Sequence, residues 1–302
     1  PLFILAGSIM NSSGISRRLI AFASALVGFI KGGLSMINIA TSMFFAEISG
    51  SAVADVAALG SILIPAMKKK GYPGPFAAAV TSSSASLAII IPPSIPMIVY
   101  AVMAQSSVVQ LFVAGVVPGI IGGFLMMFAA YIYARRKNLP IEESFNLVNL
   151  RKTAKEAALA FLLPIIILGG IFGGVVTATE GAGLAVVAAL IIGLIYREFD
   201  FKRLYQAATE GAIQTAAVML LVAASVLLGE FLTVEQIPQK VAESIIEMTQ
   251  NKYAVLAILN VFLLVIGFFL HSVAAIILTV PIVMPLVNAV GIDPVHFGII
   301  VT

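Results

Sequence analysis

The sequence contains no cysteine, few charged residues and only two histidines. The absence of cysteine excludes disulfide bonds, thiolate metal sites and cysteine nucleophiles, although it does not identify a compartment. Charged residues make up 10% of the chain, whereas a soluble domain typically carries about 25%. No Walker loop, zinc-protease helix motif or Ser-His-Asp series is present. We therefore expect neither an enzyme nor a protein with a nucleic-acid partner.

What the chain has instead is apolar sequence in long runs. Hydrophobic residues make up 61% of it, and its mean hydropathy is +1.11. A surplus of this size cannot be hidden inside one globule, so much of it must face lipid. Unbroken runs favour membrane-spanning helices over a barrel, whose strands would alternate apolar and polar residues. The longest runs are 108–133, 158–176, 182–196, 213–232 and 253–270.

The basic residues predict the orientation of these spans, because lysine and arginine concentrate in short cytoplasmic loops. When all the basic clusters are placed inside, the spans alternate in direction without contradiction, and the loop that holds Glu235, Glu243 and Glu247 lies outside. The clusters are Arg17-Arg18, Lys31, residues 68–70, residues 135–137, Arg151-Lys152, Arg197 and Lys202-Arg203.

The segment 32–67 is predicted to enter the membrane and return. Lys31 and Lys68 both belong inside, and the roughly 36 residues between them give about 27 Å of helix in each direction. The midpoint is Ser49-Gly50-Ser51, a small polar turn that suits the tip of a re-entrant hairpin buried in protein. The alternative is two short full spans with a tight outer turn.

A broken helix is predicted over 75–104. Its serine-rich run 81–86 is followed by Pro92-Pro93, which cannot donate backbone hydrogen bonds and must interrupt the helix. The freed carbonyls from about Ala88 to Ile91, with the oxygens of the hairpin tip, suit a sodium ion. The alternative is a structural proline kink with serines packing helix against helix. Candidates for contact with substrate or coupling ion are Ser83, Ser84 and Ser94.

An internal repeat is predicted from a shift of about 220 residues. Ser51 then aligns with His271, Pro65 with Pro285 and Gly71 with Gly291. The flanking charges place the two copies in opposite orientations, which predicts an inverted repeat; chance similarity between apolar helices is the alternative. The expected first repeat is 1–134, with the hairpin 32–67, the broken helix 75–104 and a span 108–134. A cytoplasmic amphipathic arm, 135–157, precedes the second repeat, 158–302, with an arm 200–212 and a hairpin 253–290.

The repeat also predicts a second, partial sodium site at His271, Ser272 and Thr302. Asp55 is an ionisable residue in an apolar setting and is a functional candidate by default, although it could instead lock the hairpin turn. Two further candidates, Thr179 and Glu180, lie near the outer end of a span. A helix N-cap with an acidic first turn explains Glu180 without any function.

Six motifs, in order along nearly the whole chain, carry a resemblance to one family. The sequence resembles the large membrane subunit, of DctM and SiaM type, of tripartite ATP-independent periplasmic (TRAP) transporters. The chain begins without methionine and ends inside an apolar run, so we expect a part of a longer protein. The motifs are Pro1-Leu2-Phe3-Ile4-Leu5-Ala6-Gly7, Ser49-Gly50-Ser51-Ala52-Val53-Ala54-Asp55, Ile91-Pro92-Pro93-Ser94-Ile95, Gly115-Val116-Val117-Pro118-Gly119, Thr177-Ala178-Thr179-Glu180 and Gly291-Ile292-Asp293-Pro294-Val295-His296-Phe297-Gly298.

The resemblance implies an all-α polytopic protein of the bacterial inner membrane, with an elevator fold of inverted repeats, two re-entrant hairpins and broken helices. It implies a sodium-driven importer of carboxylates such as C4-dicarboxylates or sialic acid. The implied partners, besides the lipid bilayer, are a small membrane subunit and a periplasmic substrate-binding protein. By motif, the first sodium site would use Ser49, Gly50 and Ser51 with backbone carbonyls of Ala88, Ile91 and Pro93.

Two other classes of function stay open. The chain could be a stand-alone sodium- or proton-coupled anion transporter, or a channel or scaffold without coupled transport. An intramembrane enzyme would need a catalytic pair that the sequence does not offer.

Overall fold

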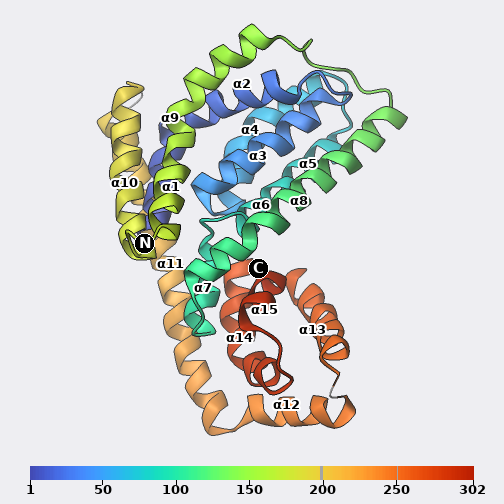
Figure 1. The fold of residues 1–302 in the computed structure, drawn as a ribbon, viewed down its shortest axis with the longest axis vertical. Helices are drawn as coiled ribbons and strands as arrows, with labels where there is room; N and C mark the ends of the chain where they lie inside the picture. Colours follow the sequence, from blue (N-terminus) through green and yellow to red (C-terminus); the bar gives the residue numbers. More distant parts are fainter. Residues whose placement is uncertain (198–199, 250) are drawn as a thin grey trace. The chain divides into compact units, whose positions relative to one another are not determined.

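The computed structural model describes residues 1–197, 200–249 and 251–302, and within them the chain forms helices and no strands (Figure 1). The expectation of an all-α membrane protein is confirmed. The helices are α1 Leu2–Ser12, α2 Ile15–Val27, α3 Gly33–Ser49, α4 Ala52–Lys69, α5 Gly74–Ala85, α6 Leu87–Ile90, α7 Ile95–Met103, α8 Val108–Arg136, α9 Leu147–Phe172, α10 Ala178–Ile195, α11 Phe201–Val234, α12 Ile237–Met248, α13 Lys252–Gly267, α14 Ser272–Ala289 and α15 Pro294–Val301.

Five helices in the described residues are long and apolar enough to cross a membrane, or six if the interrupted pair 74–90 and 95–103 counts as one span. The five are α8, α9, α10, α11 and α14. Large apolar side chains stay exposed along them: on α8, Phe124, Leu125 and Phe128 are 63%, 62% and 63% exposed. In water such a surface would drive association, whereas in a bilayer lipid covers it. The chain is therefore a multi-pass membrane protein.

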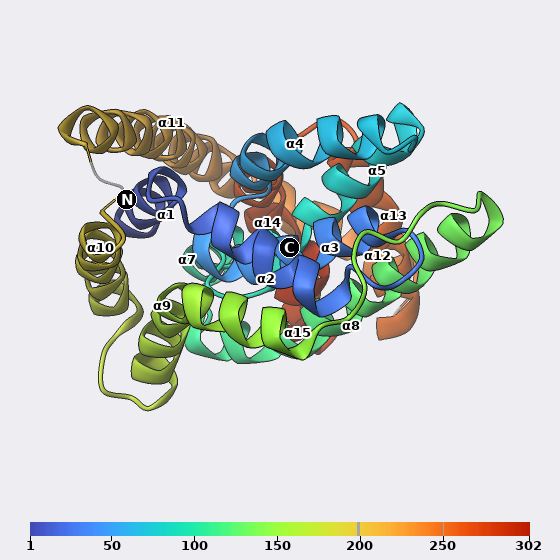
Figure 2. The same cartoon turned by 90° about the horizontal axis from the view of Figure 1, so that it is seen from above.

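The helices form two compact units, and the first contains residues 1–94 and 115–212. At its centre, α3 and α4 form a helical hairpin that packs against α5 and α6, while α2 and α9 cover α3 (Figure 2). The hairpin turns at Gly50, whose φ of 56° lies in the left-handed region that glycine adopts most readily. Ser51 then caps α4, its hydroxyl accepting from the amide of Ala54 at 3.5 Å.

Aromatic rings fix α2, α3 and α9 together inside this unit. The ring of Phe22 meets those of Phe44 and Phe161 at centroid distances of 5.5 and 5.3 Å, and Phe44 meets Phe161 edge-on at 5.2 Å. On the other side of the hairpin, Phe76 of α5 stacks on Tyr133 of α8 at 4.0 Å. Such ring pairs add to the stability that burial alone supplies.

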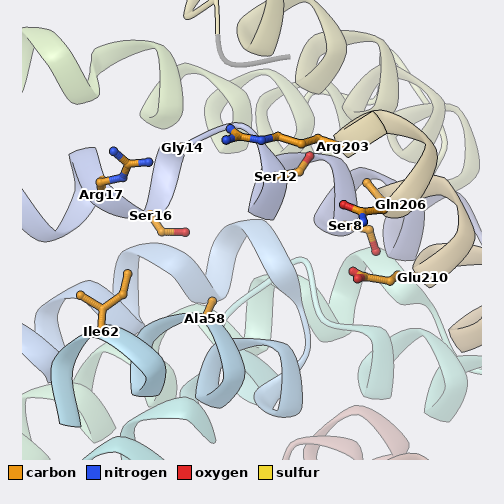
Figure 3. A pocket seen from close by; sticks show the side chains of 11 residues that line it. Ser8, Ser12, Gly14, Ser16, Arg17, Ala58, Ile62, Arg203, Gln206 and Glu210 are labelled. Carbon is orange, nitrogen blue, oxygen red and sulfur yellow. The ribbon is translucent and has the colours of Figure 1, made fainter. Parts of the chain in front are cut away.

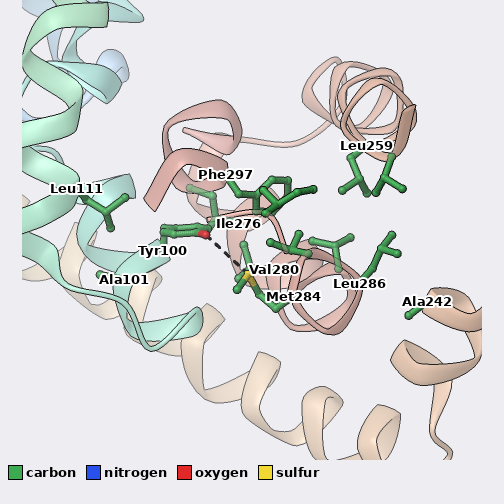
Figure 4. Close-up of a cluster of buried hydrophobic side chains, with 14 residues drawn as sticks. Tyr100, Ala101, Leu111, Ala242, Leu259, Ile276, Val280, Met284, Leu286 and Phe297 are labelled. Carbon is green, nitrogen blue, oxygen red and sulfur yellow. Dashed lines mark hydrogen bonds between the residues drawn. The ribbon is translucent and has the colours of Figure 1, made fainter. Parts of the chain in front are cut away.

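The second unit contains residues 95–114 and 213–302 and is built around α14. Helices α7, α12, α13 and α15 pack against α14, and Tyr100 lies fully buried among them (Figure 4). The Tyr100 hydroxyl donates to the carbonyl of Pro294 at 2.6 Å and contacts the sulfur of Met284 at 3.7 Å. Gly298 lets α15 approach this ring, because a Cβ there would lie 2.5 Å from Tyr100 Cε1.

The two predicted arms differ from what the structure shows. Residues 147–157 are the first turns of α9, residues 139–146 are non-helical, and 201–212 are the first turns of α11. No proline interrupts 147–163 or 200–234, so each helix propagates from its polar end into its apolar span. Neither predicted arm is therefore a separate helix, and residues 139–146 of the first form a non-helical connection.

Helix boundaries repeat at the shift of about 220 residues found in the sequence. Helices α4 and α14 both contain 18 residues, and Ser51 and His271 both stand at their N-caps. The connections that follow share a glycine with positive φ, 84° at Gly71 and 69° at Gly291. Equal elements in equal order support a duplicated unit. The inverted orientation of the copies and their predicted bounds stay predictions.

Candidate ion-binding site

The predicted tip of the first hairpin lies between α3 and α4. Gly50 is buried, and its amide donates to the carbonyl of Ala46 at 3.1 Å. Ser51 is half-buried, and its carbonyl accepts from the amide of Asp55 at 3.1 Å. Asp55 is fully buried in the first turn of α4. The side chain of Ser49 lies outside the described residues, so its predicted role stays a prediction.

The predicted helix break is confirmed at residues 91–94, between α6 and α7. Pro92 and Pro93 carry no N–H, so the carbonyls of Ala88 and Ile89 lose their helical donors. The Ser94 hydroxyl replaces one of them by donating to the carbonyl of Ile89. The Ala88 carbonyl has no helical donor, because Pro92 has no N–H, and so it is open to a different partner. Because α6 packs against both α3 and α4, this interruption lies against the hairpin.

A buried polar network joins the hairpin to α5. The Asn38 amide donates to the Thr81 hydroxyl at 2.7 Å, and the hydroxyls of Ser42 and Ser84 lie 2.9 Å apart. Ser84 also donates to the amide oxygen of Asn38 at 3.4 Å. All four side chains are at most 1% exposed. Satisfied networks of this kind hold two helices in one register, because breaking any link leaves a buried group without a partner.

One hydroxyl beside this network has no partner. Thr41 Oγ1 is fully buried on α3 and makes no hydrogen bond within the part of the chain that the structure describes. Uncharged hydroxyl and carbonyl oxygens dominate this region, and oxygen ligands of this kind suit a hard cation. The residues around the break therefore fit a sodium ion better than they fit a transition metal, which would favour imidazole or thiolate.

Gly119 of α8 lets that helix approach the break closely. A Cβ at this position would lie 2.5 Å from the Ile91 side chain and 3.5 Å from its backbone nitrogen. This contact explains one glycine of the motif 115–119. It places α8 against the side chain and backbone nitrogen of the residue before Pro92, so α8 supports the geometry of the break.

The open end of the hairpin is tied by the loop that follows α8. The amides of Gly32 and Gly33 donate to the carbonyl of Pro140 at 3.1 and 3.2 Å, and Lys70 pairs with Glu142 at 3.3 Å. Burial raises the pKa of Tyr72 to about 12. Its hydroxyl therefore stays protonated and contacts the same Pro140 carbonyl at 3.4 Å. This loop bridges the start of α3 and the end of α4.

The remaining first-repeat candidates fall into different surroundings. Ser84 belongs to the polar network, whereas Ser83 is exposed beside an apolar groove under α8. Thr179 and Glu180 are both exposed. Glu180 forms a capping box with Thr177, accepting from its amide at 2.7 Å, as the capping explanation predicts. Within the described residues, the hydrogen bonds of the Glu180 side chain all go to Thr177, so the structure does not bring Glu180 to the break.

The second predicted site lies in the second unit. His271 is exposed at the N-cap of α14 and makes no capping hydrogen bond through its side chain, and Ser272 follows it, half-buried. The Thr302 hydroxyl donates to the carbonyl of Gly298 at 2.8 Å. At a shift of 220 residues, His271 and Ser272 align with Ser51 and Ala52 at the first tip, and Thr302 aligns with Ser82, ahead of the first break. The role of all three residues as sodium ligands stays a prediction.

Sequence reasoning missed Asn38, Thr41 and Ser42. Their spacing of three and four residues places them on one face of α3, and Thr81 and Ser84 share a face of α5 in the same way. Small polar residues recurring at helical spacing within apolar sequence were the available signal. The pairing between the two faces could not be seen, because it depends on how the hairpin packs.

Comparison with known proteins identifies the family. Residues 1–302 match the family described as "Tripartite ATP-independent periplasmic transporter, DctM component". The chain belongs to the DctM component of the TRAP transporters. The resemblance found in the sequence is thereby confirmed.

Curated relatives of this DctM-family chain are named as transporter permeases for different organic anions. The chain is 42% identical over 99% of its length to the isethionate TRAP transporter permease protein DctMQ of Oleidesulfovibrio alaskensis, and covers 48% of that protein. It is 41% identical to the C4-dicarboxylate large permease DctM of Pseudomonas aeruginosa and 36% identical to the sialic acid large permease SiaM of Vibrio cholerae. Each of these two matches includes 99% of this chain and 70% of the relative. The chain thus spans about half the length of one relative and over two thirds of the others.

Proposed function

We propose that this chain forms the transport subunit of a sodium-coupled importer of small organic anions. A sodium ion would bind where the interrupted helix meets the hairpin α3–α4. The observation that carries the proposal is the packing of α6 against both hairpin helices, at the point where Pro92 takes the helical donor from the Ala88 carbonyl. Most of the oxygens at this place are uncharged carbonyls and hydroxyls, so they would bind a monovalent cation and release it on each transport cycle.

Each residue in this region has a definite part. In this proposal Gly50 and Ser51 supply oxygens from the hairpin tip, and the backbone carbonyls of Ala88, Ile91 and Pro93 supply oxygens from the break. Asp55, fully buried one turn after Ser51, adds a carboxylate close to the tip. A bound cation would lower the cost of burying that carboxylate, so sodium binding and the folded hairpin would stabilise each other.

Transport would follow the elevator mechanism, in which one part of the protein carries substrate and ion across together. The polar network between α3 and α5, and the loop that ties the ends of the hairpin, support movement of α3–α6 as one body. The proposed location is the bacterial inner membrane, with the basic clusters in the cytoplasm. A small membrane subunit and a periplasmic binding protein would complete the transporter.

The named relatives support the proposed substrate class. Isethionate, C4-dicarboxylates and sialic acid are all small, water-soluble organic anions that carry a carboxylate or a sulfonate. We place the substrate of this chain in that class, with carboxylates first. Specificity among its members would rest largely with the binding protein that delivers the substrate.

Sodium binding can be tested without transport. The purified subunit should unfold at a higher temperature in sodium than in equal potassium or choline, because a ligand that binds only the folded state stabilises it. Ser51→Ala and Asp55→Asn should lose most of this difference, whereas Ser82→Ala, exposed on α5, should keep it. An equal response of the wild-type protein to all three cations would contradict a sodium site. A large unitary conductance in electrical recordings would favour a channel instead.

A further inference from the structure

A polar pocket of about 440 Å³ lies in the first unit, away from the hairpin tip (Figure 3). It is lined by α1, the first turn of α2, the middle of α4 and the first turns of α11. Its volume is far larger than a single ion needs. The side chains at its wall are hydroxyls, two guanidinium groups, one amide and one carboxylate, from Ser8, Ser12, Ser16, Arg17, Arg203, Gln206 and Glu210.

Local backbone geometry explains why the pocket forms. Gly14 has a φ of 68° and turns the chain sharply between α1 and α2. Ser8 and Ser12, one helical turn apart on α1, therefore share the pocket with Ser16 on α2. Gly211 lets α11 close over α1, since a Cβ there would lie 3.3 Å from Leu5 Cα.

The electrostatics of the pocket favour an anion. Two arginines and one glutamate line it, so its side chains carry one net positive charge. Within the residues that the structure describes, the Arg17 guanidinium makes no hydrogen bond or ion pair, and it is exposed. A planar guanidinium binds the oxygens of a phosphate or carboxylate through two parallel hydrogen bonds, and serine hydroxyls can donate further ones.

The surroundings of the pocket favour a lipid head group over a free ion. Arg17 and Arg203 belong to basic clusters that the distribution of charge places on the cytoplasmic side. On α4 the wall is apolar, with Ala58 and with Ile62, which is 43% exposed. A phosphate held by arginines beside an exposed apolar helix matches the border between head groups and acyl chains. Basic pockets between helices on this side of a membrane bind anionic head groups.

We propose that this pocket binds the head group of an anionic phospholipid, with phosphatidylglycerol as the first candidate. Arg17 and Arg203 would hold the phosphate, while Glu210 and Gln206 would accept hydrogen bonds from the glycerol hydroxyls. A lipid bound here would link α1, α2, α4 and α11 at the inner surface. This site is separate from the proposed sodium site and does not depend on sodium coupling.

The test is lipid titration of the purified full-length subunit, followed by native mass spectrometry. Phosphatidylglycerol, phosphatidylethanolamine and inorganic phosphate are compared for the wild-type protein and three variants. These are the pocket variant Arg17→Gln/Arg203→Gln, the charge-conserving variant Arg17→Lys/Arg203→Lys, and Arg151→Gln. Arg151 is an exposed basic residue on α9 that does not line the pocket, so it controls for the loss of surface charge.

The expected result is tight retention of phosphatidylglycerol, at least about tenfold weaker in the double glutamine variant and unchanged in Arg151→Gln. The double lysine variant, which keeps the charge and tests folding, should fall between them. Equal affinity of the double glutamine and Arg151→Gln variants would overturn the proposal. So would phosphatidylethanolamine or inorganic phosphate binding as tightly as phosphatidylglycerol. Displacement of the lipid by a C4-dicarboxylate would also overturn it, and would assign the pocket to the solute path.

Discussion

The side-chain amide of Asn38 on α3 donates a 2.7 Å hydrogen bond to the hydroxyl of Thr81 on α5. Both groups are buried, so this bond joins the hairpin α3–α4 to the helix that is interrupted after it. The Thr81 hydroxyl in turn donates to the carbonyl of Ala77 at 2.9 Å. If one partner is removed, the other cannot form a hydrogen bond with water instead. Losing the bond would therefore weaken the packing between the hairpin and the break.

Thr81→Val should destabilise the protein by about 1–3 kcal/mol, because the Asn38 amide then stays buried without a good acceptor. Valine keeps the shape of threonine, so packing is little changed. Thermal unfolding in detergent measures the effect. The matched control is Ser82→Ala, one residue further on the exposed face of α5, which should change stability by less than about 0.5 kcal/mol. An equal effect of both substitutions would show that the buried bond contributes nothing particular.

Thr41→Val should separate a structural role from a role in ion binding. The Thr41 hydroxyl is buried and without a partner among the described residues, so in sodium-free buffer its removal should leave stability unchanged or raise it. If the hydroxyl receives its partner from a bound cation, the stabilisation by sodium should fall at the same time. Unfolding temperatures measured with and without sodium give both quantities. Loss of stability without sodium would show instead that the hydroxyl has a structural partner.

Gly119→Ala should impair transport more than Gly122→Ala, which lies on the same helix. A Cβ at Gly119 would collide with Ile91 at the break, whereas one at Gly122 would lie 3.4 Å from the end of the flexible Leu87 side chain. Overpacking costs about 1–3 kcal/mol, and here it displaces a residue whose carbonyl is a predicted ligand. The sodium concentration for half-maximal uptake should rise in Gly119→Ala only. Equal values for both variants would remove α8 from the support of the site.

Much of the first hairpin and the break could be predicted, because single residues dictate them. Pro92 and Pro93 are adjacent and lack an amide hydrogen, so two successive carbonyls of α6 lose their helical donors and the helix ends there. Gly50 is the residue in its segment that adopts a left-handed turn most easily, and the chain reverses there. These are local rules, and tertiary packing did not override them.

The helix starts at Leu147 and Phe201 were harder to predict. Charged sequence that precedes an apolar span forms either a separate surface helix or the first turns of the span. Which of the two occurs depends on whether a helix breaker lies between them, and none lies in 147–163. The buried network could not be predicted from the sequence for another reason. Asn38 and Thr81 come into contact only through the packing of α3 on α5.

Arg18 and Tyr196 form a second link that the sequence did not reveal. The Arg18 guanidinium lies 3.7 Å from the centre of the Tyr196 ring, and the Tyr196 hydroxyl donates to the carbonyl of Glu156 at 2.8 Å. Burial raises the pKa of Tyr196, so the hydroxyl remains a donor. In a double-mutant cycle, Arg18→Gln and Tyr196→Leu should couple by about 0.5–2 kcal/mol in thermal unfolding. Tyr196→Phe should keep the coupling with Arg18 and lose only the hydrogen bond; strictly additive effects of Arg18→Gln and Tyr196→Leu would contradict the cation–π contact.

Sodium-driven uptake is the most direct measurement. The full transporter is reconstituted in proteoliposomes together with its binding protein, and uptake of a labelled C4-dicarboxylate or sialic acid is followed under an inward sodium gradient or an equal potassium gradient. We predict accumulation above the external concentration in sodium only, and its loss in Ser51→Ala and Asp55→Asn while Ser82→Ala stays active. Equal accumulation in potassium, or full activity of both site variants, would contradict a coupling ion held between the hairpin and the interrupted helix.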